Sequence, residues 1–382
     1  MLGIVLVEGA CFFGFALPCS LQMFLLCLFV LVLGCEFERR SALGVGGEES
    51  ESRETREKAL TANEAMGMPF VAGFMLFGLY FAFKYLDAKW VNLLLRAYFT
   101  AFGAGSLAHA ARPLFEAVLP SSPLFTLPLD AIQLAKKGLP VSLALVGSSL
   151  VGCWVAYVWF TTSHWLGNNA LGMAFCIAGF STINLGSIKN STLVLVGLFV
   201  YDIFMVFGTG YLLGPNKVSV MEEVATKVEG PIKLLFPLPA QDARGRTIPF
   251  SMLGLGDIIV PGLHLALLQR FDASLLGGQA GEGEAPTPYF NAGLLAYALG
   301  IISTNISMNF MNTAQPALLF LVPFVLGLPY LLALGNGHAA QLWNWKEEGG
   351  EEVDFSLSGL VSSLLGETVS GLLGLEVKKK GD

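Results

Sequence analysis

The chain is organised as a succession of long apolar runs, each close to the roughly 20 residues that a helix needs to cross a bilayer. A helix suits lipid because it bonds every backbone N–H and C=O group within its own segment. The sequence therefore predicts an all-α polytopic membrane protein with about nine transmembrane helices. The nine runs are residues 1–35, 68–85, 91–111, 139–160, 166–188, 192–213, 251–270, 289–311 and 314–334. The fifth contains Asn168, Asn169 and Asn184, so its crossing is left open.

Composition supports this class and excludes others. The chain is 54% hydrophobic and 13% charged, with a mean hydropathy of +0.64, which is typical of polytopic membrane proteins. A net charge of −7 and the lack of a basic patch argue against nucleic-acid binding. The six cysteines lie in or at the ends of apolar runs and the four histidines lack ligand spacing, so we expect no metal site and no cofactor.

The runs and the polar stretches between them divide the chain into six parts. The first run has no basic residues before it and two arginines directly after it, which favours a retained anchor over the alternative, a cleaved signal peptide. The last part could form a surface helix or be disordered. The parts are an N-terminal transmembrane anchor (1–35), a polar cytosolic linker (36–66), transmembrane helices 2–5 (67–188), acid-bearing helices 6 and 7 with their connecting loop (189–270), helices 8 and 9 (271–334) and a flexible cytosolic tail (335–382).

The distribution of lysine and arginine indicates the orientation. With the N-terminus outside the cytosol, most basic residues fall in cytosolic segments, as the positive-inside rule requires. The basic loop between the two acid-bearing runs is an exception to this rule. We therefore expect a lumenal N-terminus and a cytosolic C-terminus, and the ending Lys379-Lys380-Gly381-Asp382 matches a dilysine signal for retrieval to the endoplasmic reticulum.

Two of the runs carry a single acid at a central position, Asp202 in 192–213 and Asp257 in 251–270. A carboxylate inside a membrane costs about 2.5–3.5 kcal/mol, so each acid needs a partner or a wet cavity. Two facing carboxylates share one proton, which provides an acid and a base for hydrolysis by a bound water. Tyr201, Gly254 and Gly256 suit such a site, through a hydroxyl and through the close approach that small residues allow. A pathway for ions or protons fits the two acids almost as well.

Three motifs favour the hydrolytic interpretation. Tyr201-Asp202, Gly254-Leu255-Gly256-Asp257 and Pro316-Ala317-Leu318 stand in the order and spacing of the presenilin and signal peptide peptidase group of intramembrane aspartic proteases. Longer stretches, including FVYDIF, GPIKLLFP, MLGLGDIIVPG and AQPALLFLVP, also resemble the signal peptide peptidase family, and the resemblance covers about residues 68–334.

This resemblance implies a presenilin-like fold and an intramembrane aspartic endopeptidase. Asp202 and Asp257 would be the catalytic pair. Pro316, Ala317 and Leu318 would approach the aspartates and, with Gln315, shape the substrate-binding side. The loop with residues 230–237 would engage an unwound substrate, since a helical substrate hides its peptide bonds. Expected partners are the bilayer and transmembrane peptides, notably signal peptides and segments in type II orientation, and homo-oligomerisation is left open. The alternatives are a carboxylate-based channel or carrier and a non-catalytic chaperone of membrane helices.

Overall fold

The structure is a computed structural model, and it describes residues 19–42, 62–119, 123–127, 139–209, 219–237, 250–275, 287–311 and 315–347. Residues 1–18, most of the linker and most of the C-terminal tail lie outside this description, as do the predictions made for them. The chain divides into two compact units. The first unit comprises residues 1–47, 88–181 and 228–258, and the second comprises residues 48–87, 182–227 and 259–382.

The first unit combines four long helices with two short antiparallel strand pairs. Strand β1 pairs with β2, and β3 pairs with β4. Its elements are α2 (Cys19–Ala42), α5 (Ala88–Glu116), β1 (Pro123–Leu127), β2 (Leu139–Ser142), α6 (Leu143–Thr162), α7 (Trp165–Thr182), β3 (Lys233–Pro237) and β4 (Phe250–Gly254), followed by the first residues of α11 (Gly256–Leu275).

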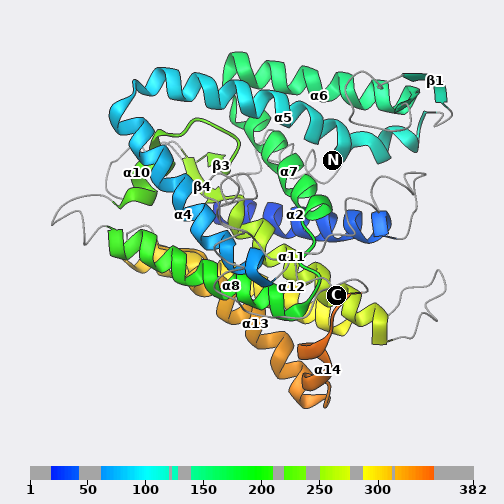
Figure 1. Cartoon of the computed structure of the whole chain (residues 1–382), viewed down its shortest axis with the longest axis vertical. Coiled ribbons are helices and arrows are strands. Elements are labelled where there is room, and N and C mark those ends of the chain that lie inside the picture. The colour runs from blue at the N-terminus through cyan, green and yellow to red at the C-terminus, as the bar shows by residue number, and fades with distance from the viewer. Residues whose placement is uncertain are drawn as a thin grey trace, which may run out of the picture. The chain divides into compact units, whose positions relative to one another are not determined.

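The described residues of the second unit form helices and the connections between them, with one isolated β-bridge between Ser187 and Lys346. Helix α8 packs against both α4 and α13, and α12 packs against α13 (Figure 1). Its elements are α4 (Ala62–Tyr85), α8 (Ile188–Ile203), the π-helical turn η2 (Phe204–Gly208), α10 (Val220–Lys227), the rest of α11, α12 (Pro288–Met311), α13 (Leu318–Gly335) and α14 (Ala339–Asn344).

Every predicted run overlaps a helix in the described part of the chain, and the all-α polytopic membrane class is confirmed. Six helical segments are long and apolar enough to cross a membrane, whereas α5, α7 and α11 do not meet the same criterion. The count of nine crossings is therefore not confirmed. The six segments are Leu21–Arg39, Glu64–Tyr85, Leu143–Thr162, Ile188–Gly208, Pro288–Met308 and Leu318–Gly335.

Two predicted helices begin later than the sequence suggested. The runs at 139 and 251 were expected to be helical from their first residues, but residues 139–142 form β2 and residues 250–254 form β4. The apolar residues continue without a break from strand into helix, so periodicity could not mark the change. Helix α6 begins where Ser142 caps it, because the Ser142 hydroxyl accepts a hydrogen bond from Leu145 N–H at 3.2 Å.

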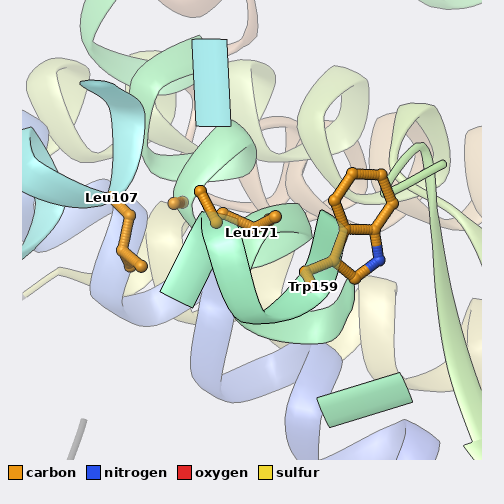
Figure 2. Packing of buried hydrophobic residues seen from close by; sticks show 5 residues of the cluster. Leu107, Trp159 and Leu171 are labelled. Atoms are coloured by element: carbon orange, nitrogen blue, oxygen red, sulfur yellow. The ribbon is translucent and has the colours of Figure 1, made fainter. Parts of the chain in front are cut away.

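The first unit has a small apolar core between its helices. Helices α5 and α6 lie side by side (Figure 1), and a cluster of buried side chains joins them to α7. Figure 2 shows Leu107, Trp159 and Leu171 at this cluster. Leu171 is fully buried, so the first half of α7 is held firmly in the unit.

Large apolar side chains also point outward from the long helices. Phe74 on α4 is 80% exposed, Leu94 on α5 is 72% exposed and Leu150 on α6 is 65% exposed. Surfaces of this kind are rare on soluble monomers and are normal where helices face lipid. Helix α5 therefore presents a lipid-compatible face although it is less apolar than the six candidate spans.

Candidate active site

Asp202 lies in the last turn of α8, at the point where the helix passes into the π-helical turn η2. π-helical turns are rare in proteins, but those that occur often lie at functional sites. The Asp202 side chain is buried, with 4% of its surface exposed. A buried carboxylate needs hydrogen bonds from the protein, because no water replaces those lost on burial.

One such bond comes from the N-terminus of α13. The backbone N–H of Leu318 donates to Asp202 Oδ2 at 3.3 Å. Leu318 is the first residue of α13, and the first N–H groups of a helix have no acceptor within the helix. The same helix end carries a partial positive charge that attracts a carboxylate. The Pro316-Ala317-Leu318 motif therefore forms the helix start that contacts Asp202.

The other predicted members of this half of the site lie close by in the chain. Tyr201 is half-buried, and its ring packs against Gly73 of α4. Gln315 and Pro316 precede the first turn of α13, and the Pro316 carbonyl accepts a hydrogen bond from Leu319 N–H at 3.2 Å. The expected roles of Tyr201 in orienting the site and of Gln315 in binding a substrate stay predictions.

Asp257 occupies a different position from the one that the sequence suggested. We expected it inside a long apolar helix, but it lies in the first turn of α11, directly after β4. Its carboxylate lies over the end of that strand, since a Cβ atom built on Gly254 would be 3.3 Å from Asp257 Oδ2. Gly256 differs, because a Cβ atom there would meet nothing within 4 Å among the described residues. A helix N-terminus also favours a carboxylate electrostatically.

Strands β3 and β4 lead directly into Asp257. Leu234 pairs with Leu253 and Phe236 with Ser251, and both side chains on β3 are buried. One more hydrogen bond continues the pairing, from Leu255 N–H to Ile232 O at 3.1 Å. The position of Asp257 within the first unit is therefore tied to β3.

Lys233 is a basic group at the start of β3. Partial burial lowers the pKa of its ammonium group, and the nearby Glu229 carboxylate opposes this effect. The backbone carbonyl of the same residue has a second role, as an acceptor for a side chain of α7.

Two asparagines of α7 hold the other edge of β3. Asn169 accepts a hydrogen bond from Leu235 N–H at 2.8 Å and donates one to Leu235 O at 2.8 Å. Asn168 donates to Lys233 O at 2.7 Å. The sequence analysis noted these residues only as polar interruptions of an apolar run. The signal was present, because adjacent asparagines inside such a run need backbone or side-chain partners.

The two aspartates fall in different units, so each is described by its own surroundings. Asp202 belongs to the second unit, with the α13 N-terminus as its neighbour, and Asp257 belongs to the first, with β4 as its neighbour. Both acids stand at junctions where a regular helix begins or changes its winding.

Fold and site together define a polytopic helical membrane protein that carries acids in its helices. A family model described as signal peptide peptidase matches residues 51–349, which is most of the chain. The chain therefore belongs to the signal peptide peptidase family, and it is an intramembrane aspartic protease.

Individual relatives support the same assignment. The chain is 33% identical over 342 residues to "Signal peptide peptidase" of Homo sapiens, covering 85% of this chain and 82% of the relative. It is 35% identical over 309 residues to the protein of that name from Mus musculus, covering 76% and 74%. It is 28% identical over 327 residues to a probable intramembrane protease of Schizosaccharomyces pombe, covering 86% and 94%. No solved structure matches the chain.

Proposed function

We propose that Asp202 and Asp257 are the catalytic pair of this protease and act together on one water molecule. The ionised carboxylate takes a proton from the water, whose oxygen attacks the carbonyl carbon of the scissile peptide bond. The protonated carboxyl group gives its proton to the carbonyl oxygen, and a tetrahedral intermediate forms. The C–N bond then breaks as the amine nitrogen receives a proton. The pair titrates as a unit, so neither role is assigned to one aspartate.

The observation that carries this proposal is the hydrogen bond from Leu318 N–H to Asp202. It links two motifs that stand far apart in the sequence, and it orients a buried carboxylate from a fixed helix end. Orientation of the reacting groups is a large part of catalysis, because small displacements lower the rate steeply. Gln315, Pro316, Ala317 and Leu318 form the substrate-binding side next to this bond, and Tyr201, Gly254 and Gly256 support the two acids.

The strands before Asp257 suit an extended substrate. A peptide bond in a helix is shielded by its own hydrogen-bond ladder, so a transmembrane substrate must unwind locally before cleavage. An unwound segment gains backbone hydrogen bonds by pairing with a strand. In this proposal the segment 230–237, which contains β3, helps to engage the unwound substrate through β4, the strand that it pairs with and that leads to Asp257.

The substrates and the cellular setting belong to the same proposal. We propose signal peptides and other single-span segments in type II orientation as substrates. The protein would reside in the endoplasmic reticulum membrane with a lumenal N-terminus and a cytosolic tail, in agreement with the distribution of its lysines and arginines. The six-part division of the chain is also part of this proposal.

Cleavage of a labelled signal peptide by the purified full-length chain in detergent tests the catalytic pair. We expect that Asp202→Ala and Asp257→Ala each abolish cleavage, and that a transition-state analogue inhibits the wild-type protein. Asp87→Asn changes an exposed acid between α4 and α5 and serves as the control. Full turnover by either alanine variant would refute the assignment of the pair.

A further inference from the structure

The outer edge of β3 is closed by side chains instead of by a third strand. In an antiparallel strand the N–H and C=O groups of one residue point to the same side. Both groups of Leu235 bond to the carboxamide of Asn169, which gives and accepts one hydrogen bond as a residue of a neighbouring strand would. Asn168 bonds the carbonyl of Lys233, two residues earlier on the same edge.

The next position on this edge, Pro237, lacks a hydrogen-bond donor. Pro237 stands two residues after Leu235 and has no N–H group to offer to another strand. Asn168 and Asn169 are 3% and 0% exposed, so neither carboxamide is available to solvent. A strand arriving from outside would have to displace three hydrogen bonds to pair with β3.

Strand β4 differs in this respect. Leu235 is opposite Met252 in the register, and the backbone groups of Leu235 face α7. The backbone groups of Met252 therefore point away from β3, as do those of Gly254 two residues later. The Met252 side chain is 44% exposed. Gly254 comes three residues before Asp257, so this edge runs toward the acid.

Helix α7 is a firm support for this arrangement. Gly172 faces the same sheet, because a Cβ atom on it would lie 3.1 Å from the Leu234 side chain. Leu171 beside it belongs to the buried cluster with Trp159 (Figure 2). The chain of contacts from α7 through β3 and β4 to Asp257 lies within the first unit.

We propose that Asn168 and Asn169 are positioning residues of the protease: they close the outer edge of β3, leave β4 as the edge on which a substrate strand aligns, and thereby set which substrate bond reaches Asp257. This inference rests on the proposed catalytic role of Asp257. A strand advances about 3.3 Å per residue and alternates its faces, so a substrate that slips by two residues presents a different bond to the same carboxylate.

The test maps the bonds that the reconstituted full-length protein cuts in a model transmembrane peptide, using mass spectrometry. Asn169→Leu removes two hydrogen bonds while it keeps the number and branching of the side-chain heavy atoms, and Asn168→Leu removes one. Asn305→Leu is the matched control, since the Asn305 carboxamide donates to Ile301 O of its own helix, α12, at 3.0 Å and not to a strand. Binding of a transition-state analogue measures the amount of folded enzyme in each sample.

We expect the wild-type cut to lose its dominance in Asn169→Leu. The ratio of wild-type product to shifted products should fall by roughly 25-fold, which is about fivefold for each of the two hydrogen bonds lost. Asn168→Leu should show a smaller shift and Asn305→Leu none. Asn169→Gln keeps the carboxamide and should restore part of the wild-type pattern. A slower reaction with an unchanged cut pattern in both leucine variants would overturn the inference, because a merely structural role predicts that result.

Two further readouts keep the inference separate from folding and from the proposed function. If Asn169→Leu does not fold, Asn168→Leu decides, and an unchanged cut pattern in that variant overturns the inference. Hydrogen exchange at residues 233–237 should become faster in Asn169→Leu, and unchanged exchange would also count against it. Wild-type protein that shows no Asp257-dependent cleavage would refute the proposed function and this inference together, whereas Asp257-dependent cleavage with unchanged cuts refutes the inference alone.

Discussion

The two glycines of the Gly254-Leu255-Gly256-Asp257 motif should differ in their effect on catalysis. A methyl group on Gly254 would lie 3.3 Å from Oδ2 and 3.9 Å from Cγ of Asp257, whereas one on Gly256 would meet no described atom within 4 Å. The first contact is tighter than an ordinary van der Waals contact, so the carboxylate in Gly254→Ala must withdraw by a few tenths of an ångström. The same substitution at position 256 needs no such movement.

The size of the effect follows from the sensitivity of catalysis to geometry. A displacement of about 1 Å can lower a rate by roughly a hundredfold, so a few tenths of an ångström correspond to roughly a three- to tenfold fall in kcat. Gly256→Ala should change kcat by less than about twofold. Replacing glycine by alanine lowers the conformational entropy of the unfolded chain equally in the two variants, so this effect on stability does not distinguish them.

Steady-state cleavage of a model signal peptide checks this prediction, with kcat and KM measured separately and enzyme concentrations set by active-site titration. Titration is needed because a fall in folded enzyme would otherwise resemble a fall in kcat. Equal kcat values in the two variants, or a larger fall in Gly256→Ala, would refute the proposed contact between position 254 and the Asp257 carboxylate.

Two predictions concern the helices that carry the acids. Asp272 of α11 accepts hydrogen bonds from Tyr289 N–H at 3.2 Å and Phe290 N–H at 2.8 Å, in the first turn of α12. Asp272→Ala removes this cap and should lower the free energy of unfolding by about 1–2 kcal/mol. The measurement is a lower Tm with an unchanged cut pattern. The Ser191 hydroxyl of α8 and His264 Nδ1 of α11 are hydrogen-bonded at 2.8 Å, and Ser191→Ala should cost about 1–3 kcal/mol because the buried imidazole loses this partner. Unchanged thermal unfolding in either variant would contradict the corresponding estimate.

The sequence was sufficient to predict the class of fold and the helices that carry the two acids. Long apolar runs have few alternatives to membrane helices, and an acid within such a run stands out because of its cost. The resemblance to a protease family also anticipated that Pro316-Ala317-Leu318 would approach an aspartate, and Leu318 contacts Asp202. That contact joins residues 116 positions apart, so composition and local spacing alone could not have predicted it.

The strands were missed for a related reason. Residues 250–254 and 139–142 continue into apolar helices, and a short apolar stretch fits a strand or a helix equally well. The choice depends on pairing with distant segments, 233–237 and 123–127, which a local pattern does not contain. For the same reason Asp257 was expected in the interior of a helix, whereas pairing between β3 and β4 delays the helix start to Gly256.

The polarity of α7 gains a physical explanation from these strands. Extended backbone in an apolar interior must find hydrogen-bond partners from the protein, because lipid offers none. Asn168 and Asn169 supply three such bonds to β3, so the polar side chains of this run are the ones that support the strands before Asp257. In the proposed function an unwound substrate pairs with extended backbone beside Asp257, and that backbone in turn requires polar side chains in a neighbouring helix. The feature that made the fifth run the weakest transmembrane prediction is thus a consequence of the site that the fold supports.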